Sequence, residues 1–168
     1  MADSDFYQPP SRARLSIIPI ASTLIASAAT ALPLIVSVPA VPPLGLMMAL
    51  AWRLRRPEMW AAWIALPLGL ADDLLGGAAL GSAMTLWTIV FLGIDAADSR
   101  PLWRDYWLDW WIAAGAILFC CINQWTFAVF TGGGGAFWPI LPQIAFAIIL
   151  FPAMARLCAV LDTWRLSR

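Results

Sequence analysis

The sequence contains no histidine and no lysine, and only 12% of its residues are charged. Without histidine, the chain lacks the commonest metal ligand and proton shuttle. The three cysteines include no Cys-x-x-Cys pair, so neither a disulfide framework nor a zinc site is expected. Cys120, Cys121 and Cys158 lie in apolar runs and are interpreted as small buried hydrophobes. The net charge is zero, and no nucleic-acid partner is predicted.

Apolar residues make up 62% of the chain, and the mean hydropathy is +0.80. A soluble domain of this size could not bury so much apolar surface, whereas lipid removes the difficulty. We therefore expect an all-α fold, a polytopic membrane bundle of about six transmembrane helices. It forms one domain at 15–161 between cytoplasmic tails at 1–14 and 162–168. The predicted spans are 15–36, 44–52 (at most 43–54), 58–75, 78–94, 106–130 and 138–161.

The first two segments admit other interpretations. The first follows two arginines and contains Ala29-Thr30-Ala31, which resembles the cleavage site of a signal peptide, although the apolar stretch is long for one. The second segment would reach only ~18 Å as a helix. It either tilts behind other helices or includes non-helical backbone. After it, Pro57 is expected to begin the third helix at its first turn.

All ten basic residues are arginines, and they fall on one side of the predicted spans. Their positions are Arg12, Arg14, Arg53, Arg55, Arg56, Arg100, Arg104, Arg156, Arg165 and Arg168. By the positive-inside rule this side is cytoplasmic, so the chain is expected in the bacterial inner (cytoplasmic) membrane with both termini inside. Several tryptophans near the same side are interpreted as an interfacial belt, namely Trp52, Trp60, Trp103, Trp107, Trp110, Trp111 and Trp164.

The sequence shows no pattern typical of an enzyme, so we predict no catalytic residue, no cofactor and no metal site. Asp72, Asp73 and Asp109 are the carboxylates expected within the membrane. Asp109 is interpreted as an interfacial group. Adjacent aspartates project about 100° apart on a helix, so Asp72 and Asp73 do not form a facing acid–base pair. Two interpretations of this pair stay open: ionisable groups that face the bundle interior, or a turn at the outer interface that aspartate caps.

The residues around this pair suggest how it is held. Gly77 and Gly81 have the Gly-xxx-Gly spacing that permits close approach of helices. No arginine is expected on this side of the membrane, so backbone amides of Gly76, Gly77 and the start of the fourth span are the predicted donors to Asp73. Elsewhere, Asn123 and Gln124 are expected to form hydrogen bonds between helices.

Two motifs lie between Pro42 and Gly81. A short span ends in Trp-Arg-Leu-Arg-Arg-Pro-Glu at 52–58, and Asp-Asp-Leu-Leu-Gly-Gly-Ala-Ala-Leu-Gly follows at 72–81. This segment resembles MreD, the rod shape-determining membrane protein family of bacteria, which has a Leu-Arg-Arg-Pro-Glu-like turn and an Asp-Leu-x-x-Gly-x-x-x-Gly motif. The matching residues are Gly69, Asp73, Leu74, Gly77, Leu80 and Gly81. The doubled aspartate and the glycine run at 132–135 depart from the family's pattern.

The resemblance implies a non-enzymatic component of the machinery for cell elongation, which controls rod shape and lateral peptidoglycan synthesis. Such a scaffold binds an MreC-like single-span protein. Through that protein it associates indirectly with RodA, the elongation transpeptidase and MreB, within membrane lipids. The candidates for structure or partner interaction are Arg55, Arg56, Pro57, Gly69, Asp72, Asp73, Gly77 and Gly81.

The family is also similar in shape to the six-helix S-components of vitamin transporters. An alternative function is therefore the substrate-binding membrane subunit of a small-molecule transporter. That function requires a polar, aromatic-lined cavity that opens outward, with Asp72, Asp73, Asn123, Gln124 and Trp125 as candidate lining residues. A scaffold needs no such cavity.

Overall fold

The computed structural model describes residues 12–31, 41–98, 106–132 and 135–166, and all regular structure within these ranges is helical. The elements are α1 (Arg12–Ala31), α2 (Leu44–Arg55), the 3-10 helix η1 (Ala62–Ile64), α3 (Ala65–Gly76), α4 (Ser82–Asp98), α5 (Tyr106–Phe130) and α6 (Ile140–Leu166). The all-α class is confirmed, and each of the six α-helices overlaps one of the predicted segments.

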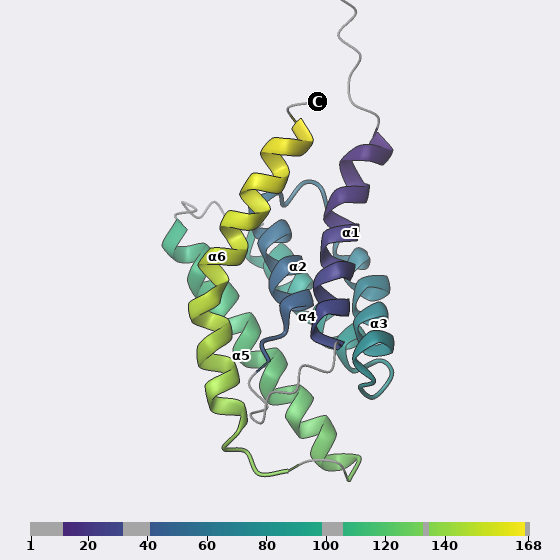
Figure 1. Cartoon of the computed structure of the whole chain (residues 1–168), viewed down its shortest axis with the longest axis vertical. Coiled ribbons are helices and arrows are strands. Elements are labelled where there is room, and N and C mark those ends of the chain that lie inside the picture. The colour runs from purple at the N-terminus through teal and green to yellow at the C-terminus, as the bar shows by residue number, and fades with distance from the viewer. Residues whose placement is uncertain (1–11, 32–40, 99–105, 133–134, 167–168) are drawn as a thin grey trace, which may run out of the picture.

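Helix α2 lies at the centre of the bundle. It packs against α1 on one side and against α5 and α6 on the other, while α3 packs against α1 and α4 (Figure 1). All residues from Gly45 to Leu54 are buried. The second segment can therefore be short because other helices enclose it, in agreement with the first of its two interpretations. The start of α1 and the end of α6 lie at the same end of the bundle (Figure 1).

Two helices are long and apolar enough to cross a membrane, α5 and the Ile140–Arg165 part of α6. Their most apolar windows have mean hydropathies of 1.7 and 2.3, and only 28% and 22% of these windows is buried. Large exposed apolar surfaces are unfavourable in water. These two helices therefore favour association with a membrane. Residues 17–30 of α1 form a shorter apolar helix.

The third helix begins later than predicted, because Pro57 does not begin a helix. Residues 57–59 form a turn in which the Met59 amide donates to the Arg56 carbonyl at 3.1 Å. The Arg53 guanidinium donates to the Pro57 carbonyl at 2.7 Å, which engages an oxygen that a helix starting here would use itself. The chain then passes through η1, and α3 starts at Ala65.

Other boundaries also move. The fourth helix starts at Ser82 rather than at residue 78, because Gly77 and Gly81 have left-handed backbone conformations, with φ of 64° and 93°. Helix α6 continues to Leu166, through most of the predicted C-terminal tail, and α1 begins at Arg12, inside the predicted N-terminal tail. Several predictions fall outside the described residues: the tail at 1–11, the span end at 32–36, Arg100, Trp103, Arg104, Arg168 and part of the glycine run at 133–134.

The interfacial belt of tryptophans holds only in part. Trp107, Trp111 and Trp164 are exposed, as a belt requires. Trp52 and Trp60 are fully buried, so their assignment to the belt was wrong. The Trp52 indole N–H donates to the Ser22 hydroxyl of α1 at 2.9 Å, which explains how a polar ring edge is accommodated in the core. The prediction that the three cysteines are buried is confirmed.

Candidate functional site

Asp73 lies near the end of α3 and is 1% exposed, and its carboxylate accepts four hydrogen bonds from the start of α4. Oδ1 accepts from the Ser82 hydroxyl and the Ala83 amide, both at 2.9 Å. Oδ2 accepts from the amides of Gly81 at 2.9 Å and Met84 at 3.3 Å. These are the first amides of α4, whose N-terminal dipole also favours a negative charge. The prediction that amides at the start of the fourth helix donate to Asp73 is confirmed. The amides of Gly76 and Gly77, which were also predicted as donors, are not among the groups that bind it.

The two turn glycines have a different role from the predicted one. A Cβ atom at Gly77 or Gly81 would meet nothing within 4 Å, so the proposed Gly-xxx-Gly helix contact at this pair was wrong. Their positive φ values instead form the turn between α3 and α4, which a residue other than glycine would adopt with strain. The close approach of the two helices occurs at Gly69, where a Cβ would lie 2.6 Å from Cα of Met84.

Asp72 does not share the environment of Asp73. It is half-buried and faces the start of α2, close to Ser27 of α1. A Cβ at Gly45 would lie 2.7 Å from Oδ1 of Asp72 and 2.1 Å from Oγ of Ser27. Gly45 therefore lets three helices meet at this polar point.

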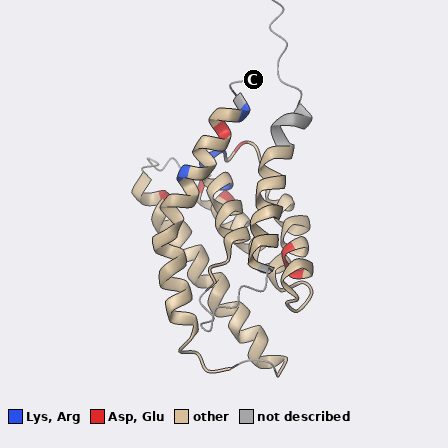
Figure 2. Ribbon diagram, in the orientation of Figure 1, with Lys and Arg blue, Asp and Glu red and all other residues tan. Residues whose placement is uncertain are grey.

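At the opposite end of the bundle, Asp162 of α6 contacts arginines from the end of α2 and from α6 itself. Figure 2 shows the described basic residues at this end and an acidic pair on α3 apart from them. Asp162 is 2% exposed, and Arg56 donates to its Oδ2 from Nε at 3.1 Å and from Nη2 at 3.0 Å. Arg165 donates to Oδ1 at 2.8 Å, and Arg55 lies 3.6 Å from Oδ2. Three guanidinium groups therefore surround one carboxylate.

Sequence reasoning missed Asp162 because it was assigned to a tail. The available signal was its spacing of three residues before Arg165, which places both side chains on one face of a helix. An acidic residue at the end of an apolar run, on the side where the arginines lie, can be expected to form an ion pair with one of them. Arg55 and Arg56, which the resemblance singled out, thus bind α2 to the end of α6.

Arg53 forms a second ionic contact at the same end. Its side chain is 3% exposed, and it pairs with Asp95 and, at 3.9 Å, with Asp98 of α4. With its hydrogen bond to Pro57, this arginine joins the end of α2, the following turn and the end of α4. Pro57 therefore serves as an acceptor in the turn and not as a helix start.

A cavity of about 470 Å³ lies at the end opposite the arginines. It is bounded by the end of α1, the start of α2, the turn after α3, the end of α5 and the start of α6. Its polar lining includes Asp72, Gln124 and Gln143. The alternative function called for a cavity of this kind, but Asp73 is buried against α4 and does not line it.

The predicted amide links between helices were wrong for Asn123. Its amide group donates to the Phe119 carbonyl of its own helix at 2.8 Å. The amide that connects helices is Gln143, which donates to the Val41 carbonyl before α2 at 2.9 Å. Trp125 donates to the Gly135 carbonyl at 3.2 Å instead of lining the cavity.

Within the described ranges, no three histidine, cysteine or acidic side chains are close enough together to hold a metal ion. A comparison of the chain with known protein families, with curated protein sequences and with solved structures finds no match. The functional argument therefore depends on the motifs of the sequence and on the contacts that these motifs make.

Proposed function

We propose that this chain is an MreD-like, non-enzymatic component of the bacterial inner membrane that binds an MreC-like single-span protein in the machinery for cell elongation. The observation that carries the proposal is the environment of Asp73. The Asp73 carboxylate of the motif accepts four hydrogen bonds from the start of α4, so this group holds a turn and is not itself exposed. A scaffold requires such a shaped surface.

The turn that Asp73 holds presents apolar side chains outward. Leu74, Leu75 and Leu80 are 65%, 43% and 71% exposed. In this proposal they form the leucine turn (residues 74–80), the surface that contacts the partner's single span or its flank. Asp73 then acts as a positioning residue, because its hydrogen bonds set the path of the chain on which these leucines lie.

The other motif supports a structural role in the same way. Arg55 and Arg56 bind Asp162, and Trp52 is buried against α1. The first motif therefore joins the end of α2 to α6, and the second joins the end of α3 to the start of α4. Neither motif brings together the facing reactive groups that an intramembrane enzyme needs.

The partner is tested by pull-down. The full chain, tagged and extracted in mild detergent from a rod-shaped bacterial host, should recover an MreC-like protein. The double variant Leu74→Ser, Leu80→Ser should recover several times less of it at an equal level of the chain. The matched control is Ile89→Ser, Leu92→Ser, which removes two exposed apolar side chains (54% and 55%) from α4. Equal recovery by both double variants would exclude the leucine turn as the contact surface.

The cellular role is tested by depletion. Loss of the chain should give rounded cells, and the variants should restore rod shape in proportion to the partner that they recover. Rod-shaped cells after complete depletion would contradict the proposed function. Reporter fusions after Ser37, Gly77 and Gly134 should report the periplasm, and fusions after Arg56, Arg100 and Arg168 the cytoplasm. A periplasmic report at Arg56 would contradict the six-span arrangement.

A transporter subunit is the second candidate, and the 470 Å³ cavity with Asp72, Gln124 and Gln143 in its lining favours it. In that case the purified chain should release a small molecule on denaturation. Asp72→Asn and Gln124→Ala should abolish that release, whereas Leu74→Ser, Leu80→Ser should not. Normal rod shape together with a specific vitamin requirement after depletion would select this function over the scaffold.

A further inference from the structure

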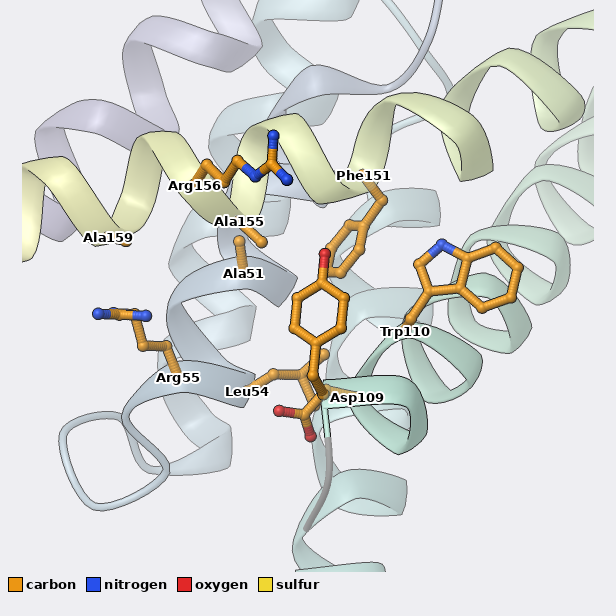
Figure 3. A pocket seen from close by; sticks show the side chains of 10 residues that line it. Ala51, Leu54, Arg55, Asp109, Trp110, Phe151, Ala155, Arg156 and Ala159 are labelled. Carbon is orange, nitrogen blue, oxygen red and sulfur yellow. The ribbon is translucent and has the colours of Figure 1, made fainter.

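A second cavity lies at the arginine-rich end, between α2, α5 and α6 (Figure 3). Its volume is about 180 Å³. The residues around it combine a small apolar floor with charged groups, namely Ala51, Leu54, Arg55, Tyr106, Asp109, Trp110, Phe151, Ala155, Arg156 and Ala159. Of these residues, only Leu54 and Arg55 belong to a motif of the MreD resemblance.

The two arginines at this cavity differ in their pairing within the bundle. Arg156 of α6 is exposed, and no hydrogen bond or ion pair of its guanidinium is found in the described part of the chain. Arg55 of α2 is 42% exposed and shares Asp162, at 3.6 Å, with two arginines that lie closer to that carboxylate. Asp109 contributes one negative charge to the rim. Arg156 therefore retains capacity for an anion, and Arg55 adds positive charge to the lining.

The floor of the cavity is apolar and narrow. Figure 3 shows Ala51 of α2 facing Ala155 of α6, with Phe151 farther along α6 and Trp110 on α5. Alanines at these positions leave room that larger side chains would fill, and the cavity opens at the end of two helices that are long and apolar enough to cross a membrane. The aromatic rings of Tyr106 and Trp110 suit the depth of lipid headgroups.

We infer that this cavity is a binding site for an anionic phospholipid. The phosphate binds at Arg156, which suits it because a guanidinium group offers paired N–H donors to phosphate oxygens. The first carbons of the lipid occupy the floor of Ala51, Ala155 and Ala159. Basic pockets between transmembrane helices on the cytoplasmic side bind anionic headgroups in the same manner. This site does not depend on the proposed function, because it requires only that the arginine-rich end meets a lipid surface.

The test is native mass spectrometry of the full chain in mild detergent, titrated with phosphatidylglycerol and, separately, with phosphatidylcholine of the same acyl chains. The wild-type chain should retain phosphatidylglycerol and release phosphatidylcholine. Arg156→Gln should weaken retention roughly fivefold, since one arginine near a charged lipid surface contributes about that factor. Ala159→Phe should weaken it to a similar extent without any change of charge, because the ring occupies the floor.

The matched control is Arg56→Gln, which removes the same charge from the same end of the bundle but does not line the cavity. It should leave retention within twofold of the wild-type value. Equal losses in Arg56→Gln and Arg156→Gln would mean that only diffuse charge attracts the lipid, and the site would be excluded. Equal retention of phosphatidylcholine would also exclude it.

Two further measurements test whether paired donors are needed and whether the ligand is a lipid. Arg156→Lys retains the charge but loses the paired donors, so retention should lie between that of the wild-type chain and Arg156→Gln. Glycerol phosphate added at millimolar concentration should not displace the lipid. Full displacement by glycerol phosphate would assign the arginines to a soluble anion and overturn the lipid site. If Ala159→Phe reduces the yield of folded chain, Ala155→Leu tests the same floor.

Discussion

Asp73 and Asp162 are almost equally buried, at 1% and 2% exposure, yet they lie at opposite ends of the bundle and have different partners. Asp73 accepts hydrogen bonds from three backbone amides and one hydroxyl group. Asp162 is surrounded by three arginines. A buried carboxylate must be compensated in either case, because transfer of an unpaired charge from water costs several kcal/mol.

The difference follows from where the arginines lie. The end of the bundle with Asp73 offers no described arginine, so the compensation comes from the first amides of a helix, which are already oriented by the backbone. At the other end, three guanidinium groups share the single carboxylate of Asp162. Backbone amides stabilise the Asp73 carboxylate without bringing a cation to that end. The arginines around Asp162 carry more positive charge than this one carboxylate neutralises. The first end is therefore suited to hold a turn, and the second to bind anions.

The largest effect is expected at the ionic end. Asp162→Asn removes the one carboxylate that Arg56 and Arg165 share, and Arg165 is only 6% exposed. Because it removes the charge of a buried carboxylate that these arginines contact, the substitution should cost about 3 kcal/mol of stability. The measurement is the unfolding midpoint of the purified chain in detergent. The control is Thr163→Ala, which changes an exposed neighbour on the same helix and should leave the midpoint unchanged. A midpoint for Asp162→Asn equal to that of the control would show that the arginines do not depend on this carboxylate.

At the other end, two substitutions of Asp73 should distinguish the loss of its hydrogen bonds from the loss of its charge. Asp73→Leu leaves the Gly81, Ala83 and Met84 amides without their acceptor, and loss of a helix cap with buried donors costs roughly 2 kcal/mol. Asp73→Asn keeps one acceptor oxygen and should cost about 1 kcal/mol. Protein level and partner pull-down should follow the same order. Harm from Asn alone, with Leu tolerated, would indicate a required charge and would contradict the structural account.

The backbone compensation also depends on the distance between α3 and α4, which Gly69 sets. Gly69→Ala places a Cβ 2.6 Å from the Met84 backbone, so the helices must separate and the hydrogen bonds to Asp73 lengthen. Overpacking of this kind costs roughly 1–2 kcal/mol. Gly115→Ala on α5 is the matched control, because a Cβ there meets nothing within 4 Å and alanine favours helix. The result would be contradicted if Gly69→Ala matched the control in unfolding midpoint.

The difference between the two ends could be predicted only in part from the sequence. The helical segments follow from long apolar runs, and the 106–130 helix was placed with the bounds that the structure gives. The donors to Asp73 were predictable because a helix start follows the motif closely. Helix contacts between distant segments were not. Gly69 matched the family pattern, but the Gly-xxx-Gly spacing drew attention to Gly77 and Gly81 instead. Asp162 was assigned to a tail, because two of its three arginine partners, Arg55 and Arg56, lie more than one hundred residues earlier in the chain.

The smallest effect gives the sharpest test of the comparison, because it depends on ionic strength. Arg56 is 47% exposed, so its pair with Asp162 is screened, and Arg56→Gln should cost less than about 1 kcal/mol in dilute buffer. Raising the salt to about 1 M shortens the Debye length to ~3 Å, so the wild-type chain and this variant should then have the same unfolding midpoint. The difference between Asp73→Asn and the wild-type chain should not change over the same range, since its partners are buried amides and one hydroxyl group. Paired melts at low and high salt therefore distinguish the two kinds of compensation. A salt-sensitive cost at Asp73, or a salt-independent cost at Arg56, would show that the two ends do not differ in the way their contacts indicate.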